Sequence, residues 1–470
     1  MATVKLNFGT GSDPGRYGPD SGPRHFNCFV EPVFEGKHPA PLVADDGFDL
    51  FVALPGGGSC RGMLEMAGLL FVVSGAAVYS VTTSGVAVLI GSLPGSTATN
   101  VSMAHNAAPT PELVIISNNV PFQVTGGVLT QITDADLPSP NSATFLNSRI
   151  LYGIDDGRFF WSEVSDADNI DALNFVTAEG NPDDLVAVVS HLQEIRAFGT
   201  RSTEVWSNTT SDVAPFQTNT SAQIPRGCLG RDTIALLDTW IFWVGDDGVV
   251  YGGKGYEGKR VSHFGVEEDI RATADKTQIE ALAYHFAGNA WYVLSGPDWT
   301  WAYNRTTERW HEKFSFGSDR WRVSKAAEFN NTVIFGDNDV GNLYQISRTS
   351  FMENDTALIF RVRSAAMSAY PNRLAVDRLH LDFVTGIGLN SPTLALQEPK
   401  VGLRWSDDGG RTWSNQLLRS LGKIGEYETR VVFNSLGITG RTGRIWEIEA
   451  SSAVIRELMY VAAEGDQIGT

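Results

Sequence analysis

The chain is poor in cysteine. Its 470 residues contain three, Cys28, Cys60 and Cys228, which lie far apart and form no C-x-x-C pair. An odd number of widely spaced cysteines argues against a disulfide framework and against a zinc ribbon. We therefore expect three buried free thiols.

Positive charge is also scarce. The 36 Lys and Arg residues are outnumbered by 54 Asp and Glu, which gives a net charge of −18. A general DNA-gripping surface needs Lys and Arg to neutralise phosphates, so this composition argues against that class of protein. It is compatible with a protein that lets nucleic acid slide past without sticking.

Long apolar segments are missing. The N-terminal residues show no apolar signal-peptide core. The stretch 66–104 has no charged side chain, but Gly, Ser and Thr interrupt its apolar runs every few residues. A membrane-spanning helix needs about 20 mainly apolar residues. We expect buried strands in this stretch and no membrane insertion.

Signatures of catalysis and of metal binding are absent. No two of the eight histidines lie two, three or four residues apart, and there is no nucleophile elbow or phosphate-binding loop. Most of the adjacent carboxylate pairs fall in turn contexts, where Asp makes local hydrogen bonds, rather than in a pattern typical of a glycosidase. We predict no enzyme activity, no catalytic residue, no cofactor and no metal site.

The chain is rich in glycine and aromatic residues, arranged in a repeating order. From about residue 60 to 347, a short β-branched or aromatic run, a Gly/Asn/Asp turn and a second such run recur seven times. The first runs centre near Phe71, Val114, Leu151, Ile195, Phe242, Tyr292 and Ile334. Paired strands that repeat every 40–50 residues or so are typical of a β-propeller. We assign residues 60–351 to a propeller of six or seven blades.

Two segments depart from this repeat. Residues 266–286 space their apolar positions as a helix does, which predicts one or two short helices between blades. Residues 1–59 are rich in Gly and Pro and predict an extended N-terminal arm with strand pieces. The arm is a candidate for docking onto a neighbouring subunit or onto the adaptor.

Residues 352–470 have longer strands. Val376, Leu379, Leu381 and Phe383 are the apolar positions of one stretch of alternating apolar and polar residues. This pattern favours a second, antiparallel domain, most simply a β-sandwich. The overall fold class is therefore all-β, a propeller followed by a C-terminal sandwich.

One short segment matches a known turn motif. Ser406, Asp408, Gly410, Thr412 and Trp413 fit the Asp-box pattern S-x-D-x-G-x-T-W. In such a hairpin turn the aspartate accepts backbone N–H groups, the glycine permits the turn and the tryptophan packs beneath it. We interpret the motif as a structural turn, because a sialidase would carry several such boxes across its blades.

The order of several segments resembles the tail-hub family of short-tailed bacteriophages, also called packaged-DNA stabilisation proteins. The matching segments span most of the chain and include PRHFNCFVEP, VSMAHN, SRILYGIDDGRFFWSEVSDADNIDALNF, EIRAFGTRSTEVWSNT, LRWSDDGGRTWSNQ and GRIWEIEASSAVIRELMYV.

This resemblance implies a virion structural protein of the tail, made in the host cytoplasm, with no enzyme activity. The expected assembly is a homo-hexameric ring, or nozzle, below the portal and its adaptor ring. It would close the filled head, extend the DNA channel, and anchor tail spikes or fibres and a needle or plug. The net charge fits an acidic lumen past which DNA moves without specific binding.

Two other functions remain open from the residues alone. One is a carbohydrate-active or glycan-binding propeller, for which the single Asp box and the lack of a clear acid pair are poor support. The other is a protein-binding propeller scaffold. The motif order favours the tail hub over both.

Overall fold

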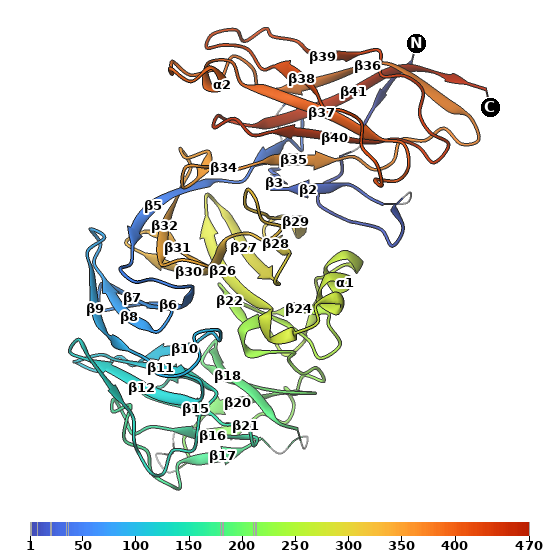
Figure 1. Cartoon of the computed structure of the whole chain (residues 1–470). Helices are drawn as coiled ribbons and strands as arrows, with labels where there is room; N and C mark the ends of the chain where they lie inside the picture. The colour runs from blue at the N-terminus through green and yellow to red at the C-terminus, as the bar shows by residue number, and fades with distance from the viewer. Residues whose placement is uncertain are drawn as a thin grey trace.

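The propeller has seven blades. The computed structural model describes residues 2–6, 8–18, 21–33, 35, 37–178, 180, 183–209, 211 and 214–469. Within these residues, seven units of four antiparallel strands surround one axis (Figure 1). The all-β propeller expected from the sequence is confirmed, and each predicted hairpin forms the second and third strands of one blade.

The first six blades are continuous in sequence. Blade 1 consists of β6 (Cys60–Met66), β7 (Leu69–Ser74), β8 (Ala77–Val81) and β9 (Ala87–Ser92). Blade 2 consists of β10 (Ser102–His105), β11 (Glu112–Ser117), β12 (Val120–Thr125) and β13 (Val128–Gln131). Blade 3 consists of β14 (Ser142–Leu146), β15 (Arg149–Gly153), β16 (Arg158–Trp161) and β17 (Phe175–Thr177). Blade 4 consists of β18 (Leu185–His191), β19 (Glu194–Gly199), β20 (Thr203–Asn208) and β21 (Phe216–Thr218). Blade 5 consists of β22 (Ala235–Leu237), β23 (Trp240–Val244), β24 (Val250–Gly253) and β25 (Lys259–Arg260). Blade 6 consists of β26 (Glu280–Phe286), β27 (Asn289–Ser295), β28 (Thr300–Asn304) and β29 (Arg309–Glu312).

The apolar runs of the sequence are explained by blades that are buried on both faces. In β7, Phe71 and Val73 pack between blades 1 and 2, whereas Leu70 and Val72 pack between blades 7 and 1. Successive side chains of a strand point to opposite faces, so a strand inserted between two neighbours needs apolar residues at every position. Within the uncharged stretch 66–104, β7 and β8 are buried strands, as predicted, whereas β9 is largely exposed.

The ring of blades is closed by seven separate hydrophobic clusters. One cluster lies between each pair of neighbouring blades, including the pair formed by blades 7 and 1. The three cysteines are buried free thiols, as expected. Cys60 and Cys228 each lie in one of these clusters. No single blade could bury both of its faces alone, so the stability of the propeller depends on ring closure.

Blade 7 is completed by the N-terminal arm. Its strands are β30 (Val323–Phe329), β31 (Thr332–Asp337), β32 (Asn342–Ser347) and, outermost, β5 (Gly47–Ala53). β5 runs antiparallel to β32, with Phe48 opposite Ile346. The propeller boundary expected at residue 60 is thus too late, because the arm supplies the strand that closes the ring.

The second domain is a sandwich of two sheets around one core. It contains β35 (Phe360–Arg363), β36 (Arg373–Phe383), α2 (Leu394–Gln397), β37 (Lys400–Ser406), β38 (Leu417–Ser420), β39 (Val431–Asn434), β40 (Ile445–Ala450) and β41 (Glu457–Ile468). Residues 352–357 form the short strands β33 (Met352–Glu353) and β34 (Thr356–Ala357), which extend the sheet of blade 7. The four apolar positions predicted for residues 376–383 all face the sandwich core.

The rest of the N-terminal arm belongs to the sandwich of its own chain. Strands β1 (Ala2–Lys5) and β4 (Leu42–Ala44) pair with β41, and β3 (Cys28–Val30) pairs with β4. Leu6, Phe8 and Cys28 contribute to the core. These strands of the arm therefore dock onto their own chain.

One strand of the arm joins the two domains. β2 (Arg24–Phe26) pairs in parallel with β29 of blade 6 and antiparallel with β35 of the sandwich. A single nine-stranded sheet results, in the order β26-β27-β28-β29-β2-β35-β40-β37-β38. Backbone hydrogen bonds thus continue from propeller to sandwich.

The predicted helical segment is only partly helical. α1 (Phe264–Ala272) and a 3-10 turn (Lys276–Gln278) precede blade 6, but residues 280–286 form its first strand, β26. Within β26, Glu280, Leu282 and Tyr284 are buried and alternate with half-buried positions. The β26 residues alternate with a period of two, and pairing with β27 favours the strand.

Candidate functional site

The Asp-box residues lie in the turn that follows β37. Ser406 Oγ donates a hydrogen bond to Asp408 Oδ1 at 2.7 Å, and the backbone N–H groups of Arg411 and Thr412 donate to the same oxygen at 2.9 Å. Gly410 has a φ of +90°. These hydrogen bonds, that of Thr412 first, hold the pKa of Asp408 well below its usual range.

Trp413 is not buried under this turn. Its ring is half-buried and faces two arginines, with the guanidinium carbons of Arg363 and Arg404 at 4.9 and 5.1 Å from the ring centre. The turn also contacts the N-terminal arm, since a Cβ at Gly18 would lie 2.5 Å from the Gly409 carbonyl oxygen. The motif therefore lies at the edge of the joint between the domains.

The joint carries a ladder of arginines and glutamates across the nine-stranded sheet. In one row Arg24 is opposite Arg363, Arg363 is opposite Glu447, and Glu447 is opposite Arg404. In the neighbouring row the residues that face one another are Glu312, Phe26, Arg361 and Glu449. The opposite charges that Glu447 and its two facing arginines carry stabilise the neighbouring strands. Arg24 faces the like-charged Arg363 and is compensated by its ion pair with Glu312.

Glu447 is the centre of this ladder. Arg404 forms an ion pair with it, and Arg363 Nε donates to Glu447 Oε2 at 2.6 Å. Burial alone would raise the pKa of Glu447, but the hydrogen bonds and charges of Arg404 and Arg363 outweigh it and leave the pKa below its usual range. A buried carboxylate with two arginines keeps its charge and fixes the register of three strands.

Aromatic rings separate the arginines. Phe26 packs under the guanidinium groups of Arg24, Arg361 and Arg363, and Phe314 lies 5.0 Å from that of Arg361. Arginine stacks on aromatic faces while its edge still binds carboxylates. The ladder is thus a packed layer rather than a set of solvated ion pairs.

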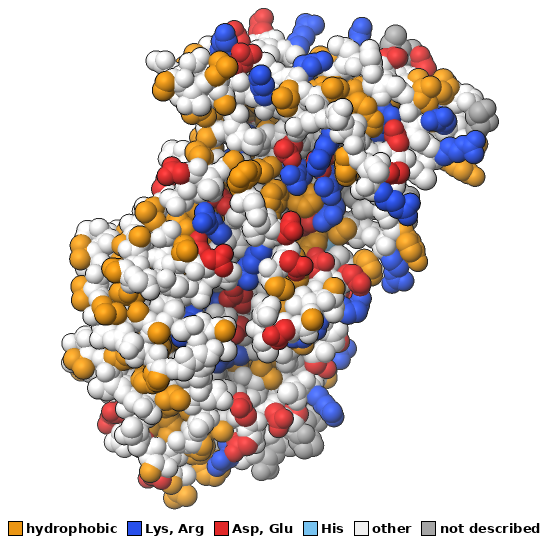
Figure 2. All heavy atoms as spheres, in the orientation of Figure 1, with side chains coloured by type: hydrophobic (Ala, Val, Ile, Leu, Met, Phe, Trp, Pro, Cys, Tyr) orange, Lys and Arg blue, Asp and Glu red, His pale blue; other side chains and the backbone are white. Residues whose placement is uncertain are grey.

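A groove of about 500 Å³ opens beside the ladder, between the propeller and the sandwich. Arg24 and Arg361 form one part of its wall, and Trp299 and Phe316 form another. Phe316 is 64% exposed. Figure 2 shows charged side chains of both signs gathered in this region below the sandwich.

Under the groove lies a second, fully buried polar cluster. Asp45, from the arm, accepts hydrogen bonds from Lys313 at 2.8 Å and from His311 at 3.2 Å. Burial would raise the pKa of Asp45, but the charges and hydrogen bonds of these two partners hold it well below its usual range. Burial also raises the pKa of nearby Glu353 to about 7, although its Oε1 accepts the Trp321 indole N–H at 2.9 Å.

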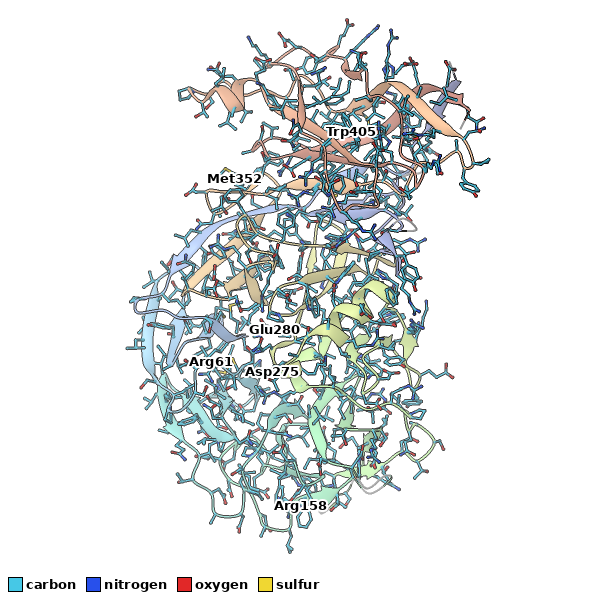
Figure 3. All side chains as sticks on the ribbon, turned by 45° about the vertical axis from the view of Figure 1, so that its right-hand side comes forward. Arg61, Arg158, Asp275, Glu280, Met352 and Trp405 are labelled. Carbon is cyan, nitrogen blue, oxygen red and sulfur yellow. The ribbon has the colours of Figure 1, made fainter. Side chains whose placement is uncertain are left out.

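The axis of the propeller contains a separate charged cluster. Glu280 of β26 binds Arg320 and Lys325, and accepts a hydrogen bond from Asn100, which precedes blade 2, at 3.0 Å. Arg231 donates to the Asn100 carbonyl at 3.1 Å. Loops of opposite blades are thus linked across the axis, near the labelled Arg61 and Glu280 of Figure 3.

Sequence reasoning missed the arginine ladder. Its signal was the alternation Arg361-Val362-Arg363 in one strand and Glu447-Ile448-Glu449 in another, which places like charges on one face of each strand. Such faces predict pairing between strands of opposite charge.

Among the described residues no group of His, Cys, Asp or Glu is arranged to hold a metal ion. In the same part of the chain no helix is long and apolar enough to cross a bilayer.

Comparison with known families explains this architecture. A family model described as "Bacteriophage P22 Gp10, beta-propeller" matches residues 50–351, and one described as "Bacteriophage P22 Gp10, beta-sandwich" matches residues 347–459. The chain belongs to the bacteriophage P22 Gp10 family. As a member it is a structural component of a phage virion, in agreement with the resemblance seen in the sequence.

Other comparisons are distant. No curated protein matches the chain. Among solved structures, BamB from Moraxella catarrhalis is 10% identical, covers 74% of this chain and 96% of its own, and has a TM-score of 0.41. The WD40 β-propeller domain of Doa1 is 10% identical, with coverages of 64% and 96% and a TM-score of 0.42. The computationally designed Ika8 protein is 13% identical, with coverages of 63% and 99% and a TM-score of 0.38.

Proposed function

We propose that this protein is the subunit of a tail-hub ring that lies below the portal and adaptor, closes the DNA-filled head and extends the DNA channel. Membership of the P22 Gp10 family, which spans both domains, is the observation that carries the proposal. The ring would be a homo-hexamer in which one face of each subunit meets a different face of the next. Its outer surface would anchor spikes or fibres, and its end a needle or plug.

The joint between the domains supports a role in which the two domains of a subunit must stay together under force. The nine-stranded sheet crosses from one domain to the other, the Arg24–Glu312 ion pair joins its connecting strand β2 to blade 6, and the buried Asp45 of the arm pairs with Lys313 just after blade 6. A ring that retains pressurised DNA needs subunits whose domains do not move apart. A joint made of backbone hydrogen bonds and paired charges meets this need.

The charge distribution supports a channel that repels DNA. Residues 101–250, which form blades 2 to 4 and most of blade 5, contain 19 Asp and Glu against 6 Lys and Arg. Residues 352–470 contain 14 against 13. Blades 3 and 4 lie at the end of the propeller far from the sandwich (Figure 1). We infer that this acidic end faces the lumen, where a lack of phosphate-neutralising cations lets DNA pass without being held.

Counting copies in purified particles tests the proposal. Quantitative mass spectrometry, scaled to the portal protein, should give about one copy of this chain for every two portal subunits, as a six-fold ring on a twelve-fold portal requires. Particles made without the protein should package DNA and then lose it. Absence of the chain from particles, or retention of DNA without it, would contradict the hub.

A further inference from the structure

One side of the propeller rim is both uncharged and apolar. Residues 66–111 contain no charged side chain, and residues 66–133 contain only Glu112. These residues form most of blade 1 and nearly all of blade 2. The propeller is therefore sharply divided, because the acidic residues are concentrated in the blades that follow.

The outermost strands on this side expose large aliphatic side chains. The exposed apolar residues are Leu50 of β5, Val86, Val88 and Leu89 in and beside β9, and Val128 of β13, which are 48–60% exposed. We call this set the uncharged rim. The three strands carry one charged residue, the exposed Asp49 beside Leu50. Figure 2 shows hydrophobic side chains along the corresponding left border of the propeller.

The three strands form one continuous surface. A Cβ at Gly85, just before β9, would lie 3.2 Å from the Phe51 carbonyl oxygen of β5, and a Cβ at Gly91 would lie 2.9 Å from Leu129 of β13. The close approach of backbone to the neighbouring strand leaves no gap between blades 7, 1 and 2. The rim is thus a single patch rather than scattered apolar residues.

The rim also has an open strand edge. Within the described residues β9 pairs with β8 alone, so its outward backbone groups have no strand partner. Natural proteins protect such edges with charged side chains, prolines or a covering element. β9 has no charge and no proline, and the irregularity in its pairing with β8 is a register shift at Val78 and Tyr79. A partner that covers the edge would complete its protection.

We propose that the uncharged rim is the surface through which one copy of this chain contacts the next; this rests on the ring proposed above. The charge of the chain selects a second copy as the occupant. Each copy carries −18 and its sandwich is nearly neutral, so contact through most of the propeller surface brings acid against acid. The rim is the sector of the propeller where a like-charged copy can approach without this repulsion, while apolar burial favours the contact.

Photo-crosslinking in intact virions identifies the occupant directly. p-Benzoylphenylalanine placed at Val88 or Leu89 should crosslink to peptides of a second copy of this chain. The matched control is Leu173, which is 82% exposed but lies in acidic blade 3, and should give no such product. Crosslinks from the rim to a different virion protein would overturn the inference and leave the hub intact, whereas absence of the chain from virions would overturn the hub itself.

A second experiment introduces a charge into the uncharged rim, and its result does not depend on the crosslinking yield. Val88→Asp and Leu89→Asp should lower the copies per portal at least about tenfold, since burying an unpaired carboxylate costs more than the 1.4 kcal/mol of a tenfold change. Leu173→Asp should keep wild-type incorporation. Circular dichroism and thermal melting of the purified variants verify that each is folded. Folded rim variants that are incorporated normally would overturn the inference.

Discussion

Arg24 binds Glu312 across 288 residues of chain, and this pair joins the N-terminal arm to the last strand of blade 6. Arg24 Nε donates to Glu312 Oε1 at 2.9 Å, and a second guanidinium nitrogen binds the other carboxylate oxygen. The next residue but one, Phe26, makes the backbone pairing with Glu312. Side chains and backbone therefore fix the arm at the same point of the joint.

Removing Arg24 should weaken the joint measurably. Arg24→Ala leaves the nearly buried Glu312 without its cation, so the unfolding free energy should fall by about 1–3 kcal/mol. Urea denaturation followed by tryptophan fluorescence measures the change. Arg271→Ala is the control, because its pair with Glu268 is exposed and should contribute less than about 0.5 kcal/mol. Equal losses in both variants would contradict the role given to Arg24.

Strand β5, which completes blade 7, should contribute as much to the free energy of unfolding as any core strand. Phe48 on β5 is fully buried against Tyr344, with ring centres 4.8 Å apart. Phe48→Ala should lower the unfolding free energy by about 3–5 kcal/mol. Leu50→Ala, on the same strand but exposed, should change it by less than about 0.5 kcal/mol. A small effect of Phe48→Ala would mean that ring closure does not depend on β5.

Glu353 should make stability depend on pH. Burial raises its folded-state pKa to about 7 from an ordinary value of 4.5, so the folded protein binds this proton more tightly than the unfolded chain does. The stabilisation is complete below the unfolded value and is lost as pH rises through about 7. The loss amounts to roughly 3 kcal/mol at most.

A neutral substitute isolates this effect. Glu353→Gln keeps an oxygen to accept the Trp321 N–H, so its unfolding free energy should match wild type at pH 4 and exceed it at pH 8. Denaturation midpoints at several pH values give the difference. The matched control is Glu65→Gln in β6 of blade 1, which leaves Glu353 in place, so the pH dependence of the wild type should persist. A constant gap between Glu353→Gln and wild type would contradict the assignment.

Two adjacent aspartates should have different roles. Asp407 binds the buried Arg444 through both carboxylate oxygens, at 2.8 and 2.7 Å, whereas Asp408 holds only the turn. Asp407→Asn should lower the unfolding free energy by about 2 kcal/mol. Asp408→Asn should instead increase proteolytic cleavage within residues 408–413 while the global unfolding transition moves less. A reversed order of the two global effects would contradict this division.

Acidic residues of the far blades should speed DNA movement. Asp136→Lys and Asp184→Lys add phosphate-binding charges, so DNA ejection from particles should slow at low salt and recover as salt screens the attraction. Dye-exclusion kinetics over a salt series measure the rate. Asp377→Lys in the sandwich makes the same change in net charge and should leave ejection unchanged. Kinetics that do not respond at any salt concentration would contradict an acidic lumen.

The blades were predictable because their signal is local. Each hairpin is an apolar run of five or six residues with its turn, as in residues 69–81, and neighbouring strands follow directly in sequence. The seven-fold count could not be decided, because the seventh blade takes its outer strand from residues 47–53. A lone strand whose partner lies some 300 residues away has no local pattern that reveals the pairing.

The candidate site was less predictable for the same reason. The Asp-box residues share one turn, and the sequence pattern identified them together. Arg24, Arg363 and Glu447 come from three strands that are brought together only by the tertiary fold. The three-residue strand β2 is too short to show alternation, and its charged residue could have belonged to any solvated loop.

The position of the arm has a consequence for biosynthesis. β5 is made before any other strand of the propeller, yet its partner β32 ends at residue 347, and β1 and β4 wait for β41, which begins at residue 457. β5 therefore leaves the ribosome long before its partner, and the edges of β1 and β4 that pair with β41 stay exposed until translation is nearly complete. Because β41 is made last, a chain that ends before residue 457 cannot complete this sandwich sheet, and only chains that reach β41 would enter the particle.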